Sequence, residues 1–191
     1  MTRKKATVLY ILFVLIMGFF FMKFSNRYFT PEQVLHANEY GLHYGPSEEV
    51  LLKYKGDDNN MLMIGKIDDI SLSVIPAKRS LGIFWRLESG GITGYLGPHY
   101  EDDRVNISYA QGYEVAYGIT DMEEAEKVSF YIEHKNNDMP DFEMRGPFEA
   151  EIDENGFFYY PVERVDEESW YYIRKTVLLD ENGYKIYEQE Y

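Results

Sequence analysis

The chain of 191 residues contains 45% hydrophobic residues, 17% aromatic residues and no cysteine, and its formal net charge at pH 7 is −14. The hydrophobic fraction is sufficient for a folded core, and the lack of cysteine excludes disulfides, thiolate metal sites and cysteine nucleophiles. So acidic a chain repels other polyanions, and no basic face offsets the charge beyond the N-terminus. We therefore expect no binding to nucleic acid, anionic lipid or anionic wall polymers.

An uncharged apolar stretch at residues 6–22 follows a basic stub at residues 1–5. As a helix this stretch is about 25 Å long; Phe24 extends it toward the roughly 30 Å of a hydrocarbon core, and Lys23 can reach the interface. The basic residues of the stub place the N-terminus in the cytoplasm by the positive-inside rule. We expect a transmembrane anchor at residues 6–24, in a single-pass protein of the cell membrane with an extracytoplasmic C-terminal region.

A cleaved secretory signal is the alternative interpretation of the same stretch. Its apolar core is usually about 7–15 residues long and is followed by a cleavage site made of small residues. Residues 18–24 are mostly bulky here, and Ser25 is the small residue that follows them. This pattern favours an anchor that is not cleaved.

A helix is predicted after a juxtamembrane linker at residues 25–30. Thr30 can cap this helix, the proline that follows fits the first helical position, and Gln33 can complete a capping box. Apolar residues at positions 34, 35 and 37 give the helix a side that can be buried, and Gly41 predicts its end.

From Glu49 onward the hydrophobic period changes to two, which is typical of β-strands. Strands joined by short turns pair as an antiparallel meander, and the preceding helix can cover one of its faces. We expect this helix and meander at residues 31–102. The strands are predicted at 50–55, 61–67, 70–74 and 81–87, with a segment at 92–96 added to the edge.

The best internal boundary is the turn-rich and acidic sequence at residues 97–103. Beyond it, short alternating strands recur at regular spacing, which is typical of a small sandwich and predicts a β-sandwich-like region at residues 103–191. Residues 121–126 can form one helical turn within it. The expected fold class is therefore mostly β (α+β), with an N-terminal transmembrane helix, a short helix plus antiparallel β-meander, and a small β-sandwich. The strands of the second region are predicted at 105–110, 115–119, 128–132, 148–152, 157–162, 171–179 and 184–188.

The tetrapeptide Asp-Glu-Asn-Gly occurs twice, at residues 153–156 and 180–183, each time between aromatic-rich segments. Asn-Gly accepts the positive φ angles that tight hairpins require, so two β-hairpins are predicted. A duplicated functional loop is the alternative interpretation.

Three stretches resemble a group of Bacillus-type, single-pass, membrane-anchored surface proteins with a β-rich extracytoplasmic region. They are ANEYGLHYGP at residues 37–46, GIFWRLESGG at residues 82–91 and DENGYKI at residues 180–186. The resemblance spans most of the chain and implies a Gram-positive source and an anchored topology. It implies no catalytic residue.

Weak candidates for a metal site come from the acidic turns. His99 is followed by Glu101, Asp102 and Asp103, and a second group is Asp121, Glu123 and Glu124. Oxygen ligands of this kind suit calcium, but neither group has the spaced pattern of a dedicated calcium loop. The four histidines also lack the spacings that are typical of zinc ligands. Solvated loops are the alternative for both groups, and we expect no cofactor, with calcium left open.

No catalytic motif stands out in the sequence. The serines near glycine lack a Gly-x-Ser-x-Gly elbow, and phosphate-binding glycine loops are absent. Among the 33 acidic residues, carboxylate pairs of the kind glycosidases use always occur and carry no information. We expect a protein that is not an enzyme, with a hydrolase of cell-wall material as a less favoured alternative.

Aromatic residues are unusually frequent, with 18 tyrosines and 12 phenylalanines. In the runs at 157–160 and 170–172 they point to both faces of their strands, where they can form protein interfaces, stack on sugars or simply pair across a half-buried sheet. The leading hypothesis is a non-catalytic envelope protein that is held in the membrane by its N-terminal helix and contacts a protein partner. A calcium- or glycan-binding surface module is the alternative.

Overall fold

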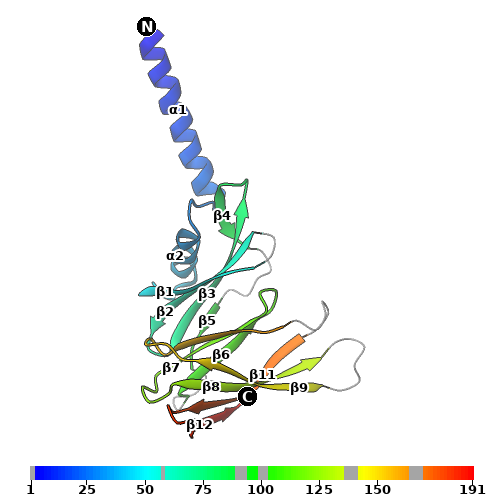
Figure 1. The fold of residues 1–191 in the computed structure, drawn as a ribbon. Helices are drawn as coiled ribbons and strands as arrows, with labels where there is room; N and C mark the ends of the chain where they lie inside the picture. The colour runs from blue at the N-terminus through cyan, green and yellow to red at the C-terminus, as the bar shows by residue number, and fades with distance from the viewer. Residues whose placement is uncertain (1–2, 57–58, 89–93, 99–102, 136–141, 164–169) are drawn as a thin grey trace.

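The structure is a computed structural model that describes residues 3–56, 59–88, 94–98, 103–135, 142–163 and 170–191. It is mostly β, as predicted, with two helices followed by antiparallel strands (Figure 1). The helices are α1 (Arg3–Phe24) and α2 (Pro31–Leu42). The first strands are β1 (Glu49–Lys55), β2 (Asn60–Asp68), β3 (Ser71–Ser80), β4 (Phe84–Leu87), β5 (Gly94–Leu96) and β6 (Val105–Ala110). The others are β7 (Val115–Thr120), β8 (Lys127–Lys135), β9 (Glu143–Glu151), β10 (Phe157–Pro161), β11 (Trp170–Leu179) and β12 (Lys185–Glu190).

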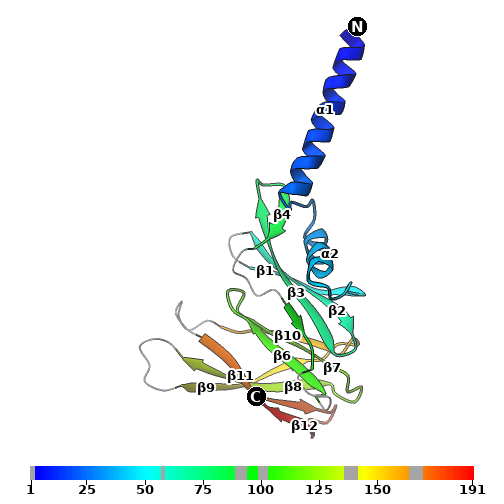
Figure 2. The same cartoon turned by 180° about the vertical axis from the view of Figure 1, so that it is seen from behind.

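Helix α1 extends away from the β-sheets (Figures 1 and 2). None of its apolar segment is buried by the rest of the protein. Its segment Lys5–Phe24 has 20 residues and is long and apolar enough to cross a membrane. A secretion signal near an N-terminus has the same properties. The structure therefore shows a candidate membrane-spanning helix.

Helix α2 begins as predicted. Thr30 accepts a hydrogen bond from the backbone nitrogen of Gln33, and the Gln33 side chain accepts one from the backbone nitrogen of Thr30, which completes the capping box. The helix continues past Gly41, however, and His43 takes the left-handed conformation that ends it, with φ of 62°. Val34 and Leu35 are fully buried against the first sheet.

Strands β1 to β4 form the predicted meander, named sheet A here, with β5 as an additional strand. Two details differ from the prediction. Strand β3 extends to Ser80, so the next strand begins only at Phe84. Strand β5 pairs with the first half of β3, where Leu72 is opposite Leu96, while β4 pairs with the second half. The long β3 therefore has two partners on the same edge.

The second region has two further sheets, which confirms a sandwich. Sheet B has the strand order β10-β7-β6, and sheet C has the order β12-β11-β8-β9. The predicted hairpin at residues 153–156 is wrong, because β9 pairs with β8 in sheet C while β10 pairs with β7 in sheet B. The hairpin at residues 180–183 is confirmed, since β11 and β12 pair with each other. Residues 121–126 form a turn and no helix.

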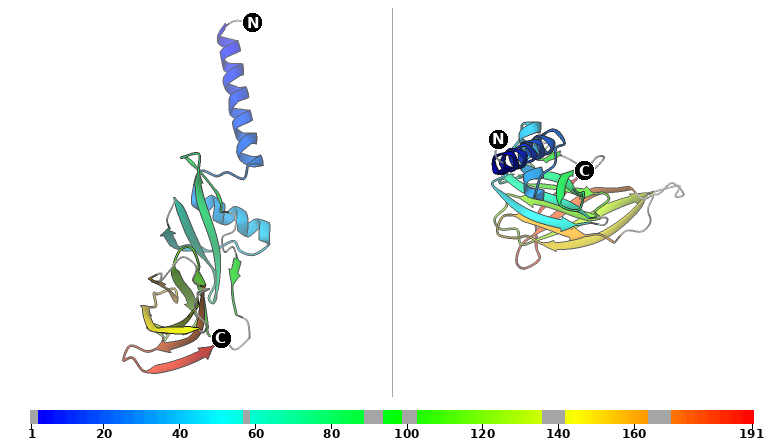
Figure 3. Two further views of the ribbon diagram at one scale, coloured as in Figure 1. Left: turned by 90° about the vertical axis from the view of Figure 1, so that its right-hand side faces the viewer. Right: turned by 90° about the horizontal axis from the view of Figure 1, so that it is seen from above.

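The layers stack in the order α2, sheet A, sheet B and sheet C. One hydrophobic cluster joins α2 to sheet A, a second joins sheets A and B, and a third joins sheets B and C. Sheet B is thus covered on both faces, and all six residues of β7 are buried. Sheet C lies at the end of the molecule opposite α1 (Figures 1 and 3). The predicted boundary between residues 102 and 103 falls between sheet A and sheet B, and the second cluster spans it.

Candidate functional site

The outer face of sheet C carries the densest group of exposed aromatic side chains among the described β-strands. Alternation along β8 and β11 turns Ile132, His134 and Tyr171 inward, where all three are buried. Their neighbours point outward. We call this outer surface the distal face and define it by Glu133, Lys135, Phe142, Met144, Trp170, Tyr172 and Arg174.

Strand register arranges the distal face in two rows that cross the sheet. In one row Lys135 is opposite Trp170, and its ammonium nitrogen lies 4.6 Å from the ring centroid of Phe142. In the next row Glu133 lies between Met144 on β9 and Tyr172 on β11. Cross-strand neighbours of this kind are close enough to form one continuous surface.

The apolar side chains of the distal face are about half exposed. The exposed fractions are 49% for Phe142, 55% for Met144, 54% for Trp170 and 48% for Tyr172. A single exposed apolar side chain is ordinary on a protein surface, whereas several that adjoin one another mark an interaction site.

Two charges of the distal face, those of Arg174 and Glu133, pair with each other. The Arg174 guanidinium donates to the Glu133 carboxylate through Nε at 2.6 Å and through Nη2, and it lies 5.8 Å from the ring centroid of Tyr172. Lys135 is placed over an aromatic ring in the way that favours cation–π attraction. A partner that covers this surface therefore meets apolar area with few unpaired charges.

Two shallow hollows adjoin on the distal face and share Arg174. They have volumes of about 330 Å³ and 470 Å³. The first is lined by Lys135, Phe142, Trp170, Tyr172 and Arg174, and the second by Tyr131, Glu133, Met144, Arg174, Lys175, Glu190 and Tyr191.

An ion pair borders the second hollow. The Lys175 ammonium lies 3.0 Å from the Glu188 carboxylate. The hydrogen bond with this carboxylate raises the pKa of Lys175, and the same bond lowers the pKa of Glu188. Both groups therefore stay charged at neutral pH and form a polar rim beside the aromatic rings.

The sequence predicted part of this surface. Trp170 and Tyr172 point outward and Tyr171 inward, but in the other aromatic run both Phe157 and Phe158 are buried. Phe142 and Met144 were missed because the strand was predicted to begin only at residue 148. Their own period of two, with a polar residue between them, is the signal that was available.

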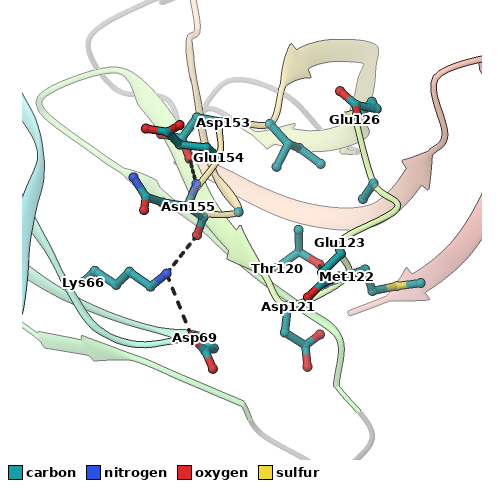
Figure 4. Close-up of a pocket in the computed structure, with 13 residues that line it drawn as sticks. Lys66, Asp69, Thr120, Asp121, Met122, Glu123, Glu126, Asp153, Glu154 and Asn155 are labelled. Carbon is teal, nitrogen blue, oxygen red and sulfur yellow. Dashed lines mark hydrogen bonds and ion pairs between the residues drawn. The ribbon is translucent and has the colours of Figure 1, made fainter.

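A second candidate is an acidic hollow of about 650 Å³ where sheet A meets two turns of the sandwich (Figure 4). The Lys66 ammonium lies in it, 3.2 Å from the backbone oxygen of Asn155 and 4.0 Å from the Asp69 carboxylate. Carboxylates surround this single lysine on several sides (Figure 4). The lining comprises Lys66, Asp69, Thr120, Asp121, Met122, Glu123, Ala125, Glu126, Ile152, Asp153, Glu154, Asn155 and Gly156.

The structure describes four of the seven predicted metal ligands, namely Asp103, Asp121, Glu123 and Glu124. Asp121 and Glu123 both line the acidic hollow, while Glu124 on the same turn does not. The Asp121 carboxylate lies 3.0 Å from Nε of Arg104, whereas Asp103 accepts a hydrogen bond from Gln189. His99, Glu101 and Asp102 lie outside the described residues. Within the described part of the chain, no three histidine or carboxylate side chains are placed to hold a metal ion.

A buried carboxylate of α2, with a histidine and a serine beside it, has the composition of a catalytic cluster but a different geometry. Glu39 is 1% exposed and accepts hydrogen bonds from the hydroxyl and the backbone nitrogen of Ser47, with His36 Nδ1 at 3.1 Å. Burial alone would raise the pKa of Glu39, but these donors outweigh it and lower the pKa. The serine donates to the carboxylate and not to the histidine, so the geometry differs from the serine–histidine pair of a nucleophilic site. The cluster instead fixes the end of α2 to the chain that enters β1.

Comparisons with protein-family models, with curated proteins and with solved structures found no match to this chain.

Proposed function

We propose that the protein is a single-pass membrane protein that keeps its N-terminal helix, with the N-terminus in the cytoplasm and the β-sheets on the outer surface of a Gram-positive cell. The apolar length of α1 and the basic residues in front of it support this topology. The bulky sequence after the apolar core favours retention of the helix.

Its proposed activity is non-catalytic binding of an envelope protein through the distal face. The observation that carries this proposal is the continuous patch of Phe142, Met144, Trp170 and Tyr172, each about half exposed. The patch surrounds the Glu133–Arg174 ion pair, and the Lys135 ammonium lies over one of its rings. Tryptophan, tyrosine and arginine are the residues that most often dominate protein-binding energy. Sheet C, which carries the patch, lies at the end of the molecule opposite α1 (Figure 1).

Glycan binding is the second candidate. Trp170 and Tyr172 are two residues apart on β11 and expose their rings on one face, about 7 Å apart along the strand. Exposed rings at this spacing can stack on successive sugars. The Glu133–Arg174 ion pair favours a protein partner, because these two groups are already bonded to each other and are less available to sugar hydroxyls.

The test replaces both Trp170 and Tyr172 by alanine in the full chain. We expect crosslinked partner recovered from membranes to fall about tenfold or more, as for interface residues that contribute about 2 kcal/mol. The matched control is Tyr184→Ala, which removes an aromatic side chain that is 71% exposed on the β11–β12 turn. Equal recovery from both variants would refute the proposal. Loss of binding to purified wall glycan, with protein crosslinks unchanged, would favour the second candidate.

A further inference from the structure

The tip of the β3–β4 hairpin lies beside the outer end of α1 (Figures 1 and 3). Tyr28 and Trp85 exchange two backbone hydrogen bonds, of 2.8 Å and 2.7 Å, and the Arg27 guanidinium donates to the Ser80 hydroxyl at 3.4 Å. The predicted juxtamembrane linker is therefore no free tether. It holds sheet A directly against the end of the apolar helix.

This hairpin tip exposes large apolar side chains. Leu81 is 68% exposed and Ile83 is 63% exposed, on either side of Gly82. Leu81 also takes a positive φ of 53°, which is unusual for a bulky residue. Turns normally carry small or polar residues. Exposure of this apolar tip to water is therefore unfavourable in free energy, and a less polar environment would stabilise it.

Aromatic and apolar side chains continue from the tip to α1. Phe24 is 82% exposed and Phe29 is 59% exposed, and the Phe29 ring lies 5.6 Å from that of Phe84. The segment Lys5–Phe24 has 20 residues, which as a helix is about 30 Å long and matches a hydrocarbon core. The outer boundary of the bilayer then falls at Phe24, the end of α1 beside which the hairpin tip lies.

Cations gather at the same level of this acidic protein. Lys78 and Arg86 are directly opposite each other on β3 and β4, an arrangement of like charges that destabilises a sheet in water. Lys78 lies 3.7 Å from Glu88. Among the described residues, no carboxylate forms an ion pair with Arg27, Arg79 or Arg86. The sequence showed no basic face because these residues come from two separate segments, which the Tyr28–Trp85 bridge joins.

We infer that Phe24, Phe29, Leu81 and Ile83, with Arg27, Arg79 and Arg86, form a collar that lies in the headgroup layer of an anionic phospholipid leaflet. The apolar side chains enter the acyl boundary, and the guanidinium groups bind lipid phosphates. Basic residues near such a surface strengthen its attraction for the protein. The collar holds sheet A against the membrane and directs the distal face away from it. This inference rests on the proposed anchor and is independent of what the distal face binds.

The test reconstitutes the full chain in phosphatidylglycerol vesicles whose acyl chains carry bromine near the headgroup, a quencher of tryptophan fluorescence. The chain has two tryptophans, Trp85 beside the collar and Trp170 on the distal face. Trp170→Phe leaves the first as the reporter, and Trp85→Phe leaves the second. We expect quenching of Trp85 at least about twofold stronger than that of Trp170, as for a residue at the membrane interface.

Variants of the collar separate its contribution from the mere proximity of α1. In the Trp170→Phe background, Leu81→Asn with Ile83→Thr removes the apolar tip, and Arg79→Gln with Arg86→Gln removes two cations. Each pair is expected to reduce Trp85 quenching to about half or less. Tyr184→Ser is the matched control and should leave the quenching of Trp85 unchanged. The arginine pair should have no effect in brominated phosphatidylcholine.

Three results would overturn the inference. Quenching of Trp85 that equals that of Trp170 would place the collar outside the lipid. Unchanged quenching of Trp85 in both collar variants would mean that α1 alone sets the depth of Trp85 in the bilayer. An arginine effect of equal size in phosphatidylcholine would exclude an anionic headgroup as the ligand. None of these results bears on partner capture by the distal face, which is measured separately.

Discussion

Phe157 and Phe158 are consecutive in β10, and their rings enter two different hydrophobic clusters. Phe157 belongs to the cluster that includes Leu62 and Val74 of sheet A, while Phe158 belongs to the cluster that includes Phe130 of sheet C. Both rings are almost fully buried. One strand of the middle sheet therefore holds the two outer sheets together.

Truncation of either ring should accordingly destabilise the protein to a similar extent. We expect Phe157→Ala and Phe158→Ala each to lower the free energy of unfolding by about 3–5 kcal/mol, because each leaves a cavity in a packed core. Tyr159→Ala should lower the free energy of unfolding much less, because the Tyr159 side chain is 45% exposed. Urea unfolding of the chain in detergent measures all three. A small effect of one phenylalanine substitution would show that one of the two interfaces is not packed.

The two Asp-Glu-Asn-Gly turns should respond differently to the same substitution. Gly156 and Gly183 have φ of 75° and 79°, so alanine is strained at both. At Gly156 an added Cβ would also lie 2.1 Å from the backbone oxygen of Thr120, whereas nothing lies within 4 Å at Gly183. Gly183→Ala should lower the free energy of unfolding by about 1 kcal/mol, and Gly156→Ala should lower it by clearly more. The melting temperature should fall accordingly further for Gly156→Ala. Equal shifts would contradict the packing of the first turn against β7.

Glu39 should make stability depend on pH. Because its pKa is lower in the folded protein than its ordinary value of 4.5, the ionised carboxylate stabilises the fold above that value. This contribution is lost as the pH falls through 4.5 and below. Glu39→Gln should lower the free energy of unfolding by about 1–3 kcal/mol at pH 7, because it disrupts buried hydrogen bonds. It should also flatten the dependence of stability on pH between pH 6 and pH 3. Profiles of equal slope for the two proteins would contradict the lowered pKa.

The proposed topology predicts an uncleaved chain. With a tag at each end, external protease on intact cells should digest the C-terminal tag and leave the N-terminal tag protected. Both tags should be present on one membrane-bound polypeptide. Recovery of a secreted fragment that begins after residue 24 would show that the helix is a cleaved signal.

The strands could be predicted because each carries its own alternation, and α2 because Thr30 and Gln33 form a local capping box. Which strand each one pairs with could not be predicted from the sequence. Phe157 is opposite Ile119, and nothing within β10 distinguishes this pairing from a hairpin with β9. The Asp-Glu-Asn-Gly turn has the same local hydrogen bonds at both positions, with Asp153 and Asp180 each accepting from two backbone nitrogens.

The candidate site was predictable to the same limited extent. Alternation shows that Trp170 and Tyr172 share a face, but which face is exposed depends on sheet B, whose strands are distant in the sequence. The collar depends on contacts between residues 27–29 and 80–85, which no local pattern reveals. Acidic residues alone do not distinguish a solvated turn from a ligand site, because the two have the same composition.

Site-specific photocrosslinking tests the proposed function most directly. A photoreactive amino acid replaces Tyr172 on the distal face in one strain and Tyr184 on the β11–β12 turn in another, and both strains are irradiated as intact cells. The proposal predicts one discrete crosslinked protein from position 172 that is absent from position 184 and is lost when Trp170 is also changed to alanine. Crosslinks that are the same from both positions, or none from position 172, would contradict it.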